Sequence, residues 1–540
     1  LARRDAEDPD YIYLIPQSEE SIWSVSTGWD KNRKVYMEFG IDYNRTFGLH
    51  KTTALILYNQ SKYYSPSLQY YVPNAYQGLV GRLTYEYASR YLAEFNMGYN
   101  GTENFAKGKR FGFFPAVSLG WVISEEKFFP KNNIVKYLKV RGSYGEVGND
   151  QIGGDRFLYL PSSYGAASDS GVNKYNFGLA SNPYTSLMIV ENKIGNPDLT
   201  WEKAKKMNVG VDINLFNNCL TASFDIFKEK RNNILANRST SPMIIGANLP
   251  AYNFGEMENR GWEMDLNFRH HIQDFHYWAR FNYSFARNEI IYMDEVQKRY
   301  DYQMTTGRRK NQFFGLIFDG YYNSWEEINA LDRPKSSWSG NQLQPGDVKY
   351  VDVNQDGVID DYDMVPIGYT PVPEIIYGFS FGAQYKGFDF SILFQGADNV
   401  SIKYFGRSMW PFAKGEESAK SLIKERWTQE RYEAGEKITF PRLSLNPNGE
   451  TDHNYRPSTL WIRDASYLRL KNLEVGYTFT GGFVKRLNLN SVRLYFNGSN
   501  LFTWTDVVDL DPEAPSRSGN VEINTYPLQK VYNIGLNINF

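Results

Sequence analysis

The last ten residues of the chain alternate between apolar and polar positions. Tyr532, Ile534, Leu536, Ile538 and Phe540 are apolar, and the residues between them are Asn or Gly. A period of two places the two sets on opposite faces of a β-strand. A strand of a transmembrane β-barrel needs one apolar and one wet face, but a terminal strand of a soluble sandwich can look the same. This segment alone leaves both folds open.

Two-faced segments recur from residue 35 to the end. Val209, Val211, Ile213 and Leu215, for example, alternate with small or polar residues. We count about sixteen such segments, within a range of roughly fifteen to seventeen, each about ten residues long, as a tilted membrane-crossing strand requires. Further examples are 117–123, 138–144, 220–226, 262–268, 377–383, 388–394, 473–479 and 492–496.

The connections between these segments come in two lengths. Short turns are expected near residues 47, 89, 130, 217 and 272 and at Tyr385-Lys386-Gly387. Long connections are expected at roughly 147–203, 231–254, 322–374, 398–465 and 505–529. Outer-membrane barrels combine short periplasmic turns with long external loops, whereas soluble sandwiches seldom carry so many loops beyond ~15 residues. This combination of short and long connections therefore favours a transmembrane antiparallel barrel in which 322–374 is an extracellular loop region.

Strand counts made from the two ends of the chain disagree by one within residues 289–374. With Phe540 in the periplasm, the turn at Tyr385-Lys386-Gly387 is periplasmic, and counting forward from the earlier short turns makes those periplasmic too. Either one strand in 289–374 is not recognised, or Phe313 to Tyr321 does not cross the membrane.

Composition excludes several other classes of protein. Aromatic residues make up 16% of the 540 residues, and aromatic belts at membrane interfaces would account for this excess. The mean hydropathy is -0.53, and no run of about 18 apolar residues exists, so membrane-spanning helices are excluded. The formal net charge of -2 gives no support to nucleic-acid binding.

Residues 352–363 have the spacing of a calcium-binding loop. Gly357 stands at position 6, where the chain must bend, Val358 at position 7 would offer its carbonyl, and Ile359 at position 8 would anchor the loop. Position 12 is Asp rather than Glu, which weakens bidentate coordination. The alternative is an ion-free Asx-rich turn. Side-chain oxygen donors stand at positions 1, 3, 5, 9 and 12, which are Asp352, Asn354, Asp356, Asp360 and Asp363.

No recognised catalytic motif is present, so we expect the chain not to be an enzyme. G-x-S-x-G, H-E-x-x-H, P-loop and Cys-x-x-Cys patterns are all missing from the sequence. Four loop aromatics, Tyr404, Phe405, Trp410 and Phe412, are candidates for stacking on sugar rings. They are equally suited to pack the loops together or to form an interface with a partner.

Seven motifs in order resemble the barrel of SusC/RagA-type TonB-dependent transporters. They span residues ~110 to 540 and no single one is decisive. In chain order they are Phe113-Phe114-Pro115 with Trp121, Leu138–Asn149, Asn196–Glu202, Gly255–Glu263, Pro345–Tyr350 with the calcium-like loop, Tyr467–Tyr477 and Asn497–Phe502.

The resemblance implies a 22-stranded outer-membrane barrel of Bacteroidota, filled by an N-terminal plug. It also implies a TonB box that engages the TonB-ExbB-ExbD complex, and a SusD-like lipoprotein lid over the external loops. Substrates would be oligosaccharides, or peptides in some members. The plug, the TonB box and the first strands have no counterpart in the sequence, so we expect residues 1–540 to be the C-terminal part of such a barrel. An open sheet would leave unsatisfied edges in lipid, so we expect it to close against those further strands.

Energy-coupled import without covalent chemistry is the function that this resemblance implies, with the barrel in contact with outer-membrane lipid and lipopolysaccharide. A passive porin or adhesin barrel is one alternative. The other alternative is a soluble carbohydrate-binding or glycan-degrading β protein. A membrane barrel needs detergent for extraction and a soluble protein does not, so extraction would distinguish these two classes.

Overall fold

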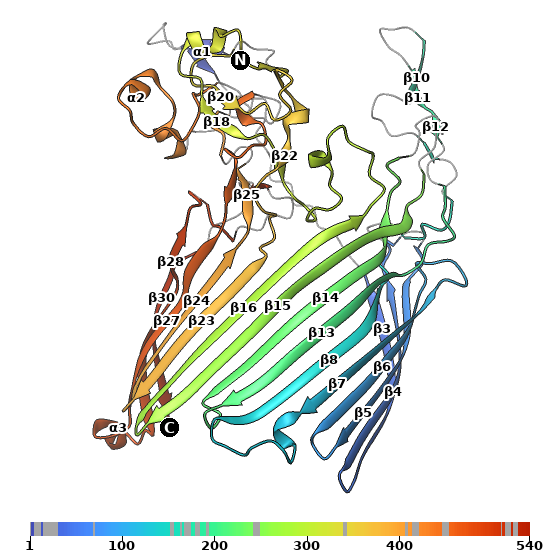
Figure 1. Cartoon of the computed structure of the whole chain (residues 1–540), viewed down its shortest axis with the longest axis vertical. Coiled ribbons are helices and arrows are strands. Elements are labelled where there is room, and N and C mark those ends of the chain that lie inside the picture. The colour runs from blue at the N-terminus through green and yellow to red at the C-terminus, as the bar shows by residue number, and fades with distance from the viewer. Residues whose placement is uncertain are drawn as a thin grey trace.

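The structure is a computed structural model dominated by one large β-sheet (Figure 1). It describes residues 2–4, 12–14, 31–68, 71–151, 156–161, 165–166, 174–178, 184–190, 194–240, 249–338, 343–404, 409–412, 421–444, 453–508, 510–513, 520–521 and 528–540. None of the helices in these ranges is both long and apolar enough to cross a membrane.

Fifteen strands form this sheet in chain order, each antiparallel to its neighbours, and the two end strands each pair on one side within the described residues. The predicted all-β fold and the lower end of the predicted strand count are therefore confirmed. The strands are β3 (Arg33–Phe47), β4 (His50–Tyr64), β5 (Asn74–Tyr87), β6 (Tyr91–Thr102), β7 (Phe111–Val122), β8 (Val135–Asn149), β13 (Glu202–Leu215), β14 (Leu220–Ala236), β15 (Tyr252–Ile272), β16 (Phe275–Tyr292), β23 (Ile375–Tyr385), β24 (Phe388–Asp398), β27 (Tyr467–Phe479), β28 (Ser491–Thr505) and β30 (Val531–Asn539).

The register of the sheet separates an apolar face from a polar face. One row of paired residues that crosses six strands is entirely apolar: Trp121, Val140, Val211, Phe224, Met264 and Tyr283. The adjacent row, one residue along each strand, holds Gly120, Arg141, Gly210, Asp225, Glu263 and Ser284. Because neighbouring residues of a strand point to opposite faces, the first row belongs to one face and the second to the other.

The short turns lie at one end of the sheet and the long connections at the other. Figure 1 shows α3 (Phe483–Arg486) and the C-terminus at the turn end, and α1 (Trp325–Asn329) with the other loop elements at the opposite end. The turn between β23 and β24 and the turn between β15 and β16 lie at the same end, as the sequence predicts.

Residues 293–374 contain no strand of the main sheet among those described, because β16 pairs directly with β23. Within this stretch β17 (Phe314–Gly315) and β18 (Phe318–Tyr321) form only short pairs inside the loop region. The second explanation of the mismatched strand counts is therefore correct: Phe313 to Tyr321 does not cross the sheet.

Three long connections fold together on their own hydrophobic core at the loop end of the sheet. They run between β16 and β23, between β24 and β27, and between β28 and β30. Their shared cluster includes Leu316, Val348, Tyr455, Trp461 and Val507. We call this assembly the loop core.

The shorter elements precede β3 or lie in the connections between strands of the main sheet. They are β1 (Ala2–Arg4), β2 (Ile12–Leu14), β9 (Gly165–Ala166), β10 (Lys174–Phe177), β11 (Tyr184–Leu187), β12 (Ile189–Val190), β19 (Lys335–Ser336), β20 (Val348–Tyr350), β21 (Val358–Ile359), β22 (Val365–Pro366), β25 (Ser401–Tyr404), α2 (Gln429–Glu433), β26 (Ile462–Asp464) and β29 (Asn520–Val521).

Candidate functional site

The calcium-like loop adopts a tightly bonded turn within the loop core. Asp352 accepts a hydrogen bond from the Gly357 amide at 2.8 Å, and Asp356 accepts one from the Val358 amide at 2.9 Å. Gly357 has a φ of 83°, a left-handed conformation that glycine adopts without strain. Ile359 is buried in the loop core, as an anchoring residue at position 8 should be. These two hydrogen bonds hold the carboxylates of Asp352 and Asp356, at positions 1 and 5, close to the bend at position 6.

The backbone around position 7 turns the Val358 carbonyl away from β19. The carbonyls of Gly357 and Ile359 accept hydrogen bonds from the Lys335 and Ser337 amides at 2.9 and 3.0 Å. In an extended segment, successive carbonyls point in opposite directions, so the Val358 carbonyl points away from β19. The hydrogen bonds to β19 therefore do not use the carbonyl that the calcium pattern places at position 7.

Asp363, at position 12, closes the loop from a fully buried position. Its Oδ1 accepts a hydrogen bond from the Val353 amide at 2.8 Å, and its Oδ2 accepts one from the Asp360 amide at 2.9 Å. Burial, together with the charge of Asp352, raises the pKa of the Asp363 carboxyl. A cation at the loop centre would offset both effects.

The donor chemistry fits calcium, although the carboxylates are not gathered into a ready cluster. Asp352 Oδ1 is buried and has no hydrogen-bond partner among the described residues. In the described ranges, no three His, Cys, Asp or Glu side chains converge on a metal position. The calcium pattern has four carboxylates at these positions, so an ion in this loop would have to draw their side chains together, alongside Asn354 and the Val358 carbonyl. Hard oxygen donors at this spacing suit calcium better than a transition metal.

Burial argues against a sugar-stacking role for two of the four predicted aromatics. Tyr404 is 4% exposed and Trp410 is 3% exposed, and both belong to the loop core. Trp410 packs against Tyr455 with ring centroids 4.9 Å apart. These two rings hold the loops together, which is the alternative that the sequence left open. Phe412 is partly exposed, with a left-handed φ of 59°, and Phe405 lies outside the described residues.

The polar face of the sheet carries an arginine held by two carboxylates. Arg141 of β8 forms a two-point contact with Asp225 of β14, with both distances 2.6 Å, and lies 3.1 Å from Asp212 of β13. The side chain crosses Gly210, where an added Cβ would lie 2.7 Å from Arg141 Cζ. Glycine on the middle strand therefore allows the guanidinium to lie flat on the wall.

The same arrangement recurs between β24, β27 and β28. Arg493 Nε donates to Asp389 at 3.0 Å and its Nη2 donates to Glu474 at 2.6 Å. A Cβ at Gly476 would lie 2.7 Å from Arg493 Nη2. The sequence analysis missed both sites. The residues around a glycine in a polar strand do not show which side chains lie beside it on the neighbouring strands.

A third arginine fastens a long connection to the polar face. Arg469 of β27 is buried, lies 2.7 Å from Asp511 and also contacts Glu513. Both carboxylates belong to the connection between β28 and β30. Thr503 accepts a further hydrogen bond from Arg469 at 2.9 Å. The start of this connection therefore lies against the polar wall near the loop end of the sheet.

Comparison with known proteins places this architecture among transporter barrels. Residues 5–501 match the family model described as TonB dependent receptor-like, beta-barrel. A TonB-dependent receptor of Formosa agariphila is 28% identical over 479 residues, which are 85% of this chain and 45% of that protein. TonB-dependent receptor SusC of Bacteroides thetaiotaomicron is 28% identical over 477 residues, which are 87% of this chain and 44% of SusC.

The fold also agrees with a solved structure of the RagAB peptide transporter. The TM-score is 0.71 at 22% sequence identity, over 94% of this chain and 56% of that chain. The present chain spans about half the length of the curated relatives that it matches. Since the family model covers most of the chain, the chain belongs to the TonB-dependent receptor-like β-barrel family.

Proposed function

We propose that this barrel takes part in TonB-dependent import of oligosaccharides across the outer membrane, together with a SusD-like lipoprotein. The observation that carries the proposal is a family barrel with one lipid-compatible face, one polar face and a folded loop core at one end. Such a wall lets a hydrophilic solute pass through a membrane without contact with lipid.

Each part of the protein has a stated task in this proposal. The loop core and the SusD-like lid receive the substrate outside the cell. The polar face, with Arg141 and Arg493, lines the route. A plug within the whole protein closes that route until the TonB-ExbB-ExbD complex pulls on it. No covalent step is involved, so the barrel residues act by binding and by excluding lipid.

The wall arginines favour a neutral, hydroxyl-rich substrate. Arg141 and Arg493 each contact two carboxylates, so neither presents an uncompensated positive charge. A wall with many hydrogen-bonding groups, in which each of these arginines is matched by two carboxylates, suits the hydroxyl groups of sugars better than an anionic solute. Peptides are the second candidate, because the structurally similar RagAB is a peptide transporter.

Uptake in a strain that lacks this gene tests the proposal. We expect the deletion to abolish growth on one class of oligosaccharide and a plasmid copy to restore it. Loss of growth only on peptides would support the second candidate. Unchanged growth on every glycan and peptide source would contradict import as the function.

We also propose that residues 352–363 bind a structural calcium ion. The ligands would be Asp352, Asn354, Asp356, Asp360, Asp363 and the carbonyl of Val358. The buried, unpaired Asp352 Oδ1 and the buried Asp363 support this assignment. The ion would stiffen the loop core rather than act on a substrate.

Calcium dependence of thermal unfolding in the purified protein provides the measurement. Excess calcium should raise the Tm relative to EGTA, because an ion that binds only the folded loop stabilises it by about 2.7 kcal/mol at a hundredfold excess over Kd. Asp352→Asn should remove this difference. The exposed Asp361→Asn, at a position that the pattern does not use, is the matched control. A Tm indifferent to calcium in the unaltered protein would refute the site.

A further inference from the structure

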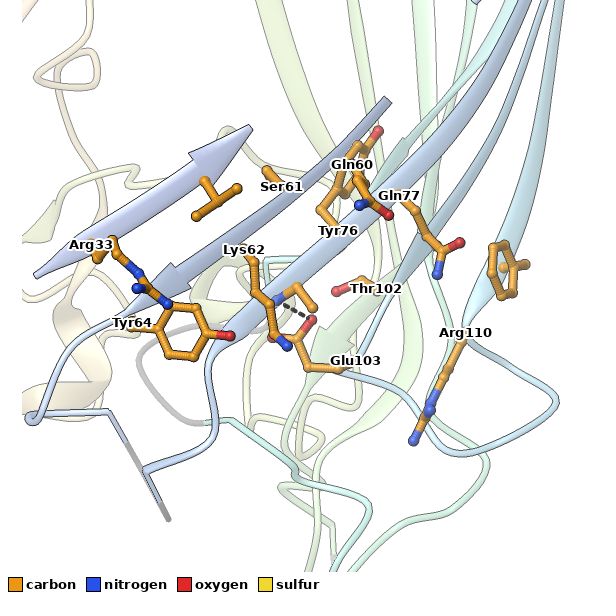
Figure 2. A pocket seen from close by; sticks show the side chains of 14 residues that line it. Arg33, Gln60, Ser61, Lys62, Tyr64, Tyr76, Gln77, Thr102, Glu103 and Arg110 are labelled. Atoms are coloured by element: carbon orange, nitrogen blue, oxygen red, sulfur yellow. Dashed lines mark hydrogen bonds between the residues drawn. The ribbon is translucent and has the colours of Figure 1, made fainter. Parts of the chain in front are cut away.

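A hollow of about 470 Å³ lies at the loop end of the first strands, on the apolar face of the sheet (Figure 2). Its lining includes the side chains of Arg33, Lys62, Gln60, Gln77 and Phe111. Arg33 and Lys62 approach it from neighbouring strands β3 and β4, on either side of Tyr64. Ser61, Tyr76 and Thr102, from the opposite face of the same strands, also line it, whereas no residue of the loop core does.

The register shows that these charged residues share the face that meets lipid. One row of paired residues is wholly apolar: Phe39, Tyr58, Leu79, Tyr99 and Phe113. Two residues nearer the loops, the row is Met37, Gln60, Gln77, Gly101 and Phe111. The next two rows bring in Lys62, opposite Val35, and then Arg33, opposite Tyr64.

This change of polarity marks the depth of the lipid headgroups. Rows on one face of a strand are separated by two residues, about 7 Å. The face therefore changes from hydrocarbon-compatible to cationic over about 20 Å or less, at the end that carries the external loops. Long cationic side chains at such a boundary reach the charged headgroup region.

The two cations have no carboxylate partner within the described part of the chain. Arg33 Cζ lies 5.1 Å and Lys62 Nζ lies 5.4 Å from the centroid of the Tyr64 ring. Glu103, which also lines the hollow, is already bound by Arg156 at 2.7 Å and by the Ala75 amide at 2.9 Å. Arg33 and Lys62 therefore offer an uncompensated double positive charge.

Two small residues, Ala75 and Gly101, line the hollow between larger neighbours. Ala75 and Gly101 lie on the strands next to Lys62 and Phe111. The Phe111 ring covers Gly101, where an added Cβ would collide with it, and stacks on Tyr99 with centroids 5.1 Å apart. A larger side chain at Ala75 would extend into the hollow, whereas the space over Gly101 is already taken by the Phe111 ring.

We propose that this hollow binds the phosphorylated sugar headgroup of an outer-leaflet glycolipid of the lipid A type. Arg33 and Lys62 take the phosphate, since charge-assisted contacts to phosphate are strong at such a boundary. The amides of Gln60 and Gln77 take sugar hydroxyls, and the acyl chains lie along the apolar row through Phe39 and Leu79. The inference rests on the outer-membrane location of the family and not on the identity of the imported substrate.

Glycolipid retained by the full-length transporter after mild detergent extraction is the first readout, by native mass spectrometry. Arg33→Gln combined with Lys62→Gln should lower the retained lipid A about tenfold, because both phosphate contacts are lost. Lys34→Gln combined with Lys51→Gln is the matched control, since it removes the same charge from the opposite face of the same two strands. Equal retention by the two double variants would overturn the site.

A second measurement uses unaltered full-length protein and therefore does not depend on assembly of a variant. Purified lipid A is compared with dephosphorylated lipid A and with phosphatidylglycerol for binding to the delipidated transporter. Phosphorylated lipid A should bind about tenfold more tightly than either. Equal binding of dephosphorylated lipid A would overturn the role of the two cations, and equal binding of phosphatidylglycerol would overturn the glycolipid assignment. Uptake assays are separate, so failure of import would not affect either result.

Discussion

Glu374 joins three segments at the loop end of the sheet. Arg287 of β16 donates to it at 2.8 and 2.9 Å, Arg309 contacts it from the following connection, and Asn399 donates from beyond β24 at 3.3 Å. Glu374 is 5% exposed. Burial by itself would raise the pKa of its carboxyl, but the two arginines hold this pKa below its ordinary value.

The depressed pKa predicts an acid-sensitive loop region. A carboxyl whose pKa is lower in the folded than in the unfolded protein stabilises the fold at pH values above its unfolded pKa, about 4.3. This contribution disappears as the pH falls through the folded-state pKa. Glu374→Gln should remove the contribution at neutral pH and destabilise the loop region by about 2 kcal/mol. Limited proteolysis of the external loops between pH 7 and pH 3 measures both effects.

The exposed Glu433→Gln, in α2, is the control for this experiment. It should leave the protease sensitivity and its pH dependence unchanged. A Glu374→Gln protein that resists protease as well as this control would show that the three-segment contact does not stabilise the loops.

Substitution of Trp410 tests whether its ring packs the loop core or binds sugar. Because it is 3% exposed in the loop core, Trp410→Ala should destabilise that core by about 3 kcal/mol or more. Thermal unfolding of the loop region measures this change. Phe412→Ala, at a partly exposed position, should cost much less. Lost oligosaccharide binding with unaltered stability in Trp410→Ala would instead restore the sugar-stacking role.

At the scale of elements, β30 depends on a single ladder within the described chain. Its nine residues pair with Ser491–Ser499 of β28, which places Leu536 opposite Leu494 and Ile534 opposite Phe496. Its apolar set therefore lies on the same face as the apolar set of β28. A slip of one residue would exchange the two faces, so lipid on one side specifies the register strongly.

Removal of Tyr532 to Phe540 should abolish assembly in the outer membrane. Without these residues, β28 would present unpaired backbone groups to lipid, and each such group costs several kcal/mol. Surface biotinylation of intact cells measures the assembled protein. Asn537→Ser, which retains a polar side chain on the same strand, is the control and should assemble. Ordinary surface levels of the truncated protein would contradict the prediction.

At the scale of the whole molecule, the family establishes where the chain resides. TonB-dependent receptor barrels and SusC relatives are outer-membrane proteins, and the family consists of transporters rather than enzymes. The predicted location, the predicted resemblance and the expectation of no catalytic activity are therefore confirmed. The choice between oligosaccharide and peptide remains a proposal.

Energy dependence separates the proposed import from a passive porin. In cells that carry the full-length protein, a protonophore should stop substrate accumulation but leave surface binding unchanged, because TonB draws on the inner-membrane proton gradient. Accumulation and binding of a labelled oligosaccharide are measured in the same cells. Accumulation that persists in the presence of the protonophore would favour the passive barrel.

The sequence by itself determined the strands, their two faces and the short turns. A period-two pattern such as Tyr532 to Phe540 is local, so no knowledge of distant residues is needed to recognise it. The spacing of Asp352, Asn354 and Asp356 is equally local, and the bend at Gly357 agrees with it. Only the number of strands within 289–374 stayed ambiguous, because the short strand Phe318–Tyr321 resembles part of a longer one.

Tertiary structure alone decided which residues meet across the sheet and inside the loops. Arg141 reaches Asp225 over Gly210, and Glu374 meets Arg287, at separations of 84 and 87 residues. Local sequence patterns cannot predict such pairs, because the order and register of the strands in the sheet bring the two residues together. For the same reason Trp410 looked available to a substrate in the sequence but lies buried in the structure. Alternation determines which face a side chain occupies, and only the folded chain determines what covers it.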